Sequence, residues 1–140
     1  MNSIAKLCLN YLKEEGYAPK LTERNDVVFK AEDKTFIVST DDGDDQFLRL
    51  LLPNFYEIET DTEMNKALRV ANKINRNVKV GKVMIMDDNH VWAFAEQFID
   101  SSPDLDDFFN RTIKVVRKAA DDFASEMLGD VDGLLRKLLR

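Results

Sequence analysis

Apolar residues follow two different periods along this chain, and the change of period divides it into segments. Helical spacing of apolar side chains predicts amphipathic helices over residues 3–15, 61–75 and 103–128. Runs rich in β-branched and aromatic residues predict strands over residues 26–31, 35–40, 46–52, 78–86 and 91–98. Residues 17–21 can add a short edge piece, where Pro19 limits pairing. The predicted order is therefore α-β-β-β-α-β-β-α.

The helix ends carry recognisable signals. Gly16 can end the first helix in a left-handed conformation. Thr60 and Glu63 match a capping box at the start of the second helix. Ser102 is expected to cap the third, with Pro103 in its first position. The apolar stripes of the first two helices are Ile4, Leu7, Cys8, Tyr11 and Leu12, and Met64, Ala67, Leu68, Ala71 and Ile74.

The third strand is apolar on both faces. Leucines at 48, 50 and 52 point one way, while Phe47 and Leu51 point the other way beside Arg49. The last two strands have a face of small and branched residues and a face of methionines and aromatics. The candidate interface on the second face is Phe47, Leu51, Met84, Met86, Trp92 and Phe94.

Each predicted helix is apolar on one side only, which favours helices packed mainly on one face of a twisted antiparallel sheet, an α+β fold. The second apolar sheet face then needs a dimer partner or a client, because large exposed apolar patches are uncommon on monomers. The alternative is that the long helix wraps across the sheet and covers both faces.

Composition places the chain among ordinary globular proteins. Its 140 residues, 44% hydrophobic and 33% charged, predict a single domain over residues 1–128 with an amphipathic C-terminal tail over 129–140. The net charge of −6 argues against nucleic-acid binding, since phosphates would be repelled. No stretch approaches the roughly 20 apolar residues that span a bilayer. We therefore expect a cytoplasmic protein with no membrane or nucleic-acid partner.

Candidate chemistry is sparse, and we expect no catalytic residue, metal or cofactor. Cys8 falls on the apolar side of a helix and His90 in a turn, so a nucleophile–base pair is not favoured. The acidic loop at 41–45 lacks the spacing of a calcium-binding loop and is interpreted as solvated. A basic helix face could bind an acidic partner, but is interpreted as solvated; it consists of Lys66, Arg69, Lys73 and Arg76.

Three segments carry a family resemblance: FLRLLLPNFY at 47–56, ALRVANKIN at 67–75 and VWAFAEQF at 91–98. With the order of elements, they make residues 3–128 resemble the YbjN-like family of bacterial proteins, whose fold is shared with type III secretion chaperones. The resemblance implies helices on an antiparallel sheet, frequent dimerisation and no enzymatic activity. Secretion chaperones of this fold bind an extended client segment through apolar patches.

The first hypothesis is a non-catalytic homodimer that binds a protein or an extended peptide, in a chaperone-like or regulatory role. The second is a small-ligand sensor with an aromatic pocket between the sheet and the long helix, which a tightly filled core would count against. The third is an enzyme, which would require a concave pocket with buried ionisable groups.

Overall fold

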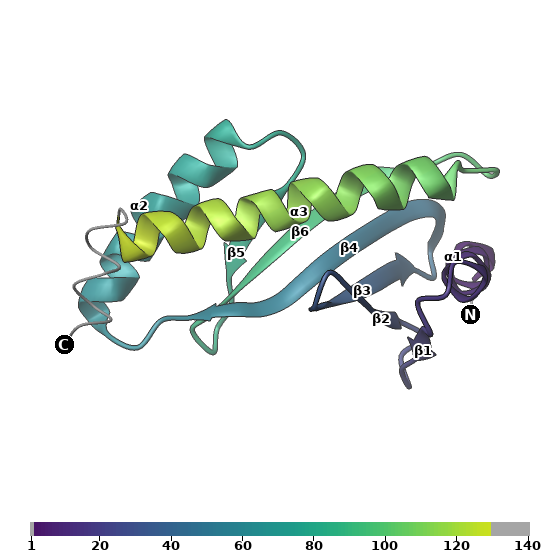
Figure 1. Cartoon of the computed structure of the whole chain (residues 1–140), viewed down its shortest axis with the longest axis horizontal. Helices are drawn as coiled ribbons and strands as arrows, with labels where there is room; N and C mark the ends of the chain where they lie inside the picture. The colour runs from purple at the N-terminus through teal and green to yellow at the C-terminus, as the bar shows by residue number, and fades with distance from the viewer. Residues whose placement is uncertain (1, 130–140) are drawn as a thin grey trace.

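The computed structural model describes residues 2–129, which form an α+β fold of three helices on one six-stranded sheet (Figure 1). The helices are α1 (Ser3–Glu14), α2 (Asp61–Asn77) and α3 (Leu105–Leu128). The strands are β1 (Lys20–Leu21), β2 (Val27–Ala31), β3 (Lys34–Asp41), β4 (Asp44–Glu57), β5 (Lys82–Ile85) and β6 (His90–Phe98). Every neighbouring pair is antiparallel, in the order β1-β2-β3-β4-β6-β5. The predicted fold class and order are confirmed, and β1 is the expected edge piece.

The helices cover one face of the sheet. The long helix α3 crosses β4 and β6 (Figure 1). Helix α2 lies beside β5 and the end of α3, and α1 lies at the other end of the sheet, against β2, β3 and β4. Alternate strand residues face these helices and form the core with them. The largest fully buried side chains include Phe29, Phe36, Phe109 and Phe123.

Two helix stripes are rotated from their predicted positions. Leu7 and Leu68 were expected in the core but are exposed, whereas Leu9 and Val70 are buried. The middle of each predicted stripe stays buried, at Ile4, Cys8, Leu12, Ala67 and Ile74, and only one flank of the stripe differs. A broad apolar stripe does not distinguish its two flanks. The start of α3 also differs from the prediction, because the side chain of Asp104 accepts the N–H of Asp107 at 3.0 Å and caps a helix that begins at Leu105.

Strand β4 continues past Pro53, where the predicted strand ended. Its pairing with β6 is interrupted between Leu52 and Tyr56, and the proline lies in that irregular segment, where no ladder hydrogen bond is lost. The extension brings Phe55 and Tyr56 against Phe123 of α3, with ring centroids 5.7 and 5.5 Å apart.

Residues 78–81 are not part of a strand, contrary to the predicted range of 78–86. Val78 follows the last turn of α2, and Val80 has a left-handed φ of 65°. Gly81 lies against α3, where a Cβ atom would be 2.2 Å from the carbonyl oxygen of Val115. Strand β5 begins at Lys82, directly after this close contact with α3. The predicted tail at 129–140 lies outside the described residues except for Gly129, and the domain boundary before it stays a prediction.

Candidate functional site

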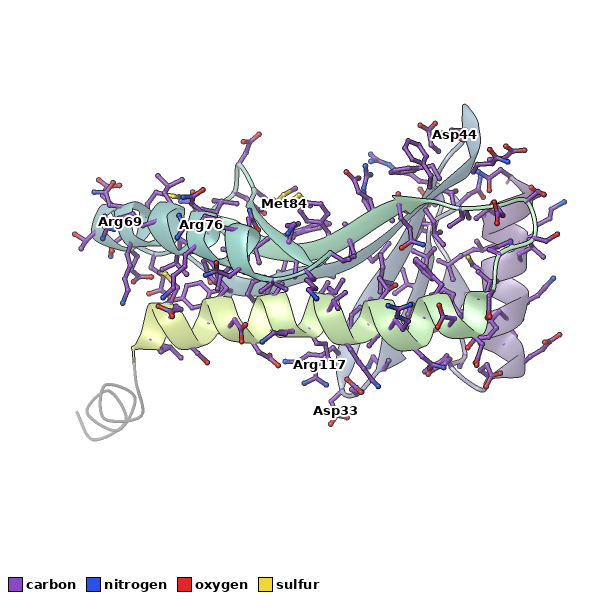
Figure 2. The ribbon with its side chains drawn as sticks, turned by 90° about the horizontal axis from the view of Figure 1, so that it is seen from above. Asp33, Asp44, Arg69, Arg76, Met84 and Arg117 are labelled. Atoms are coloured by element: carbon purple, nitrogen blue, oxygen red, sulfur yellow. The ribbon has the colours of Figure 1, made fainter. Side chains whose placement is uncertain are left out.

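One face of the sheet carries no helix within the described residues. Cross-strand pairing aligns Ile37 with Leu51 and Leu51 with Phe94, and it aligns Met84 with Trp92. We define the open sheet face as Ile37, Phe47, Arg49, Leu51, Met84, Met86, Trp92, Phe94, Glu96 and Phe98. Figure 2 shows Met84 on the side of the sheet away from α3. All six candidate interface residues thus lie on one face; their role as an interface stays a prediction.

The middle of this face holds an ion pair between apolar side chains. Arg49 and Glu96 are cross-strand neighbours: Arg49 Nε donates to Glu96 Oε2 at 2.9 Å, and Arg49 Nη2 forms an ion pair with the same oxygen at 2.8 Å. The guanidinium carbon also lies 5.1 Å from the centre of the Phe47 ring, a cation–π distance. Both charged side chains are more than one-third exposed, at 38% and 44%. The middle of this face therefore presents one positive and one negative group to solvent.

A shallow hollow of about 460 Å³ lies on the same face. Its lining consists of Arg49, Leu51, Met84, Met86, Trp92, Phe94 and Glu96. The indole N–H of Trp92 donates to Asn54 Oδ1 at 2.9 Å, which satisfies the polar end of the ring and leaves its apolar body on the face. Phe98 at the end of β6 is 79% exposed.

The two sheet edges offer little room for another strand. Beside β5, the side chain of Asn75 acts like a neighbouring strand: Val83 N–H donates to its Oδ1 at 2.7 Å, and its Nδ2 donates to Val83 C=O at 3.0 Å. Lys82 Nζ holds the same junction by donating to the carbonyls of Asn75 and Val78 at 2.8 and 2.7 Å. At the other edge, β1 has only two residues and follows Pro19. Short or covered edges disfavour edge-to-edge pairing.

Sequence reasoning missed this role of Asn75, which lies in the last turn of α2. The signal available was an amide side chain near a helix end and close in sequence to the next strand. That signal is shared by many residues that merely end helices.

The only cysteine and the only histidine do not form a reactive pair. Cys8 is fully buried in α1, and burial raises the pKa of its thiol to about 12. His90 begins β6 beside the β5–β6 turn, with Nδ1 3.3 Å from Asp88 Oδ2. The two residues lie on elements at different ends of the fold (Figure 1).

The acidic loop at 41–45 is a tight turn between β3 and β4, and Asp44 marks its tip in Figure 2. Asp41 Oδ1 accepts the N–H of Gly43 at 2.8 Å, and Asp44 Oδ1 accepts the N–H of Gln46 at 2.9 Å. These carboxylates thus stabilise the turn. In the part of the chain that the structure describes, no group of three His, Cys, Asp or Glu side chains is arranged to hold a metal ion.

The basic face of α2 is only partly a solvated face. Lys66 Nζ donates to the carbonyl of Met127 at 2.9 Å, and Lys73 pairs with Glu126 at 2.8 Å. These two lysines therefore fasten α2 to the end of α3, where the helix dipole favours positive charge. Arg69 and Arg76 are exposed.

The aromatic side chains between the sheet and the long helix pack on one another and do not line a common pocket; the hollows along α3 are lined mostly by other side chains. Phe29 contacts Phe36 and Phe109 with ring centroids 5.7 and 5.8 Å apart, and all three rings are buried. This packing counts against the small-ligand hypothesis. Among the described residues, none of the helices has the length and apolar character needed to cross a bilayer.

Comparisons with known proteins agree with this architecture. The model of the family described as "YbjN: Putative bacterial sensory transduction regulator" matches residues 9–129. An uncharacterised protein from Methanothermobacter thermautotrophicus has a similar structure, with a TM-score of 0.63 at 15% identity over 87% of this chain and 94% of that one. YbjN from E. coli, described as "a putative transcription regulator", is also similar, with a TM-score of 0.57 at 13% identity over 88% of this chain and 87% of that one.

At such identities the two structures show the fold alone. No curated protein matches the sequence. The predicted likeness to type III secretion chaperones stays a prediction.

Proposed function

The chain belongs to the YbjN family, and we propose from this premise that it is a cytoplasmic, non-catalytic regulatory module that binds another protein chain through the open sheet face. The partner is either a second copy of the chain or an extended segment of a client protein. Because one surface serves both, client binding and self-association compete.

The observation that carries the proposal is the one-sided covering of the sheet. Small and branched side chains on the helix-covered face, such as Ala93 and Ala95, are buried, whereas Trp92 and Phe94 on the other face are only partly buried. Aromatic and methionine side chains contribute large apolar areas to interfaces and adapt to partners of different shape. An apolar face of this kind, next to closed edges, favours docking onto the sheet rather than extension of it.

Light scattering coupled to size-exclusion chromatography tests the proposal. The wild-type chain is expected to elute as a dimer that dissociates on dilution. Met84→Glu places a charge on the open sheet face and is expected to give a monomer. Leu68→Glu is the matched control, because it adds the same charge at an exposed leucine on α2 and should leave the dimer intact. Thermal unfolding of each variant verifies that it folds.

A wild-type chain that stays monomeric at every concentration would remove the self-association part of the proposal. A dimer that survives Met84→Glu but not Leu68→Glu would move the interface to α2.

A further inference from the structure

The open sheet face carries complementary charges on neighbouring strands, between apolar side chains. Its central row contains Arg49 on β4 opposite Glu96 on β6. The row on one side pairs Phe47 with Phe98, with ring centroids 6.2 Å apart. The row on the other side pairs Leu51 with Phe94. One ion pair thus lies between two apolar rows, and each pair joins the same two strands.

A two-fold axis in the plane of the interface, parallel to the strands and midway between β4 and β6, acts on these rows in a simple way. It places each β4 residue of one copy over the β6 residue of the other copy that shares its row. The sheets of such a pair would pack face to face about 10 Å apart, as in aligned sandwiches. The same residues then face each other twice, as two-fold symmetry requires.

We propose that the partner on the open sheet face is a second copy of this chain in this arrangement, with Arg49 of each copy bound to Glu96 of the partner subunit. This inference rests on the proposed function and adds the occupant and its geometry. Phe47 then lies over Phe98 of the partner subunit, and Leu51 lies over Phe94 of the partner subunit. The apolar rows supply the buried area, while the exchanged ion pairs fix the alignment of the two sheets.

Charge complementarity supports a second copy over an unrelated partner. Strands β4 and β6 carry one cation and one anion on this face, and the nearby Lys82 of β5 has its Nζ held by the carbonyls of Asn75 and Val78. The centre of the face therefore does not repel its symmetry mate, whereas a net-charged centre would repel a second copy. The intrachain pair is 38% and 44% exposed, so a facing copy can reach both groups. Exposed pairs contribute little to folding, and like charges opposite each other across two strands cost a modest amount of stability. Reversing either charge is therefore expected to change association mainly, and thermal unfolding verifies that each variant folds.

Sedimentation equilibrium of charge-reversed chains tests this geometry. Arg49→Glu places two anions at the centre of the face, and Glu96→Arg places two cations there. Each variant alone is expected to dimerise roughly tenfold or more weakly than the wild type, because like charges would face each other. An equal mixture of the two variants is expected to form a mixed dimer, identified by native mass, because an anionic face then meets a cationic one.

Arg111→Glu is the control, since it makes the same change of charge on the exposed side of α3. It should leave the wild-type dissociation constant unchanged. Rescue in the mixture supports the exchange of ion pairs. Single variants that dimerise as tightly as the wild type, or a mixture without rescue, would overturn it. If Met84→Glu still abolishes the dimer in that case, the proposed function stands with another geometry. A wild-type chain that stays monomeric would overturn this geometry and remove the self-association part of the proposed function.

Discussion

Replacing Asn75 with alanine tests whether its side chain closes the β5 edge. The substitution removes the two hydrogen bonds to Val83, of 2.7 and 3.0 Å. Each partly buried hydrogen bond contributes about 1 kcal/mol, so the free energy of unfolding should fall by about 2 kcal/mol. Alanine also has a higher helix propensity than asparagine, by up to about 0.6 kcal/mol, which partly masks the loss.

Asn72→Ala is the matched control, because Asn72 is exposed on the same helix and gains the same propensity. Urea unfolding followed by circular dichroism measures both variants. With a slope of about 2 kcal/mol/M, the midpoint of Asn75→Ala should lie about 1 M below that of Asn72→Ala. Equal midpoints would refute the reasoning, since they would mean that water replaces the side chain at no cost. The opened edge should also increase aggregation at high concentration.

Three further substitutions or conditions test the packing. Gly81→Ala should lower the free energy of unfolding by about 3 kcal/mol, because its Cβ would meet an α3 carbonyl oxygen at 2.2 Å. Gly43→Ala is the control, because its Cβ would have room, and it should change the thermal midpoint little. Burial first, and then the hydrogen bond to Asp106, raise the pKa of Tyr11 above its ordinary value of 10. The contribution of the Tyr11 hydroxyl to the free energy of unfolding is therefore complete below pH 10 and is lost as the pH rises above 10. In urea titrations at alkaline pH, Tyr11→Phe should lose less stability than the wild type over the same rise in pH. Because burial raises the pKa of Cys8 to about 12, a thiol reagent at pH 8 should label the native chain only at the rate of opening; immediate labelling would contradict its burial.

The strand faces could be predicted from the sequence because side chains alternate strictly along a strand. Leu48 and Leu50 had to share one face, and Phe47 and Leu51 the other. The same argument placed Met84 with Met86, and the structure has these residues where alternation put them. A face identified in this way needs no knowledge of the loops.

Helix contacts were harder to predict because their stripes are broad. Leu68 and Val70 are both plausible core residues of α2, and only the position of α3 and β5 decides between them. Asn75 was missed for a related reason, since its role depends on an edge strand that begins seven residues later. Candidate caps at Ser102 and Asp104 both precede α3, and the local sequence does not rank them.

The fluorescence of Trp92 reports directly whether the open sheet face binds another chain. Trp92 is the only tryptophan in the chain and lies on that face, half-buried. As the concentration of the wild-type chain rises, we predict a blue shift and weaker acrylamide quenching, because the partner covers the indole. Met84→Glu should show neither change. A dimer established by sedimentation whose Trp92 emission and quenching match those of the monomer would contradict the account, because the two copies would then meet elsewhere.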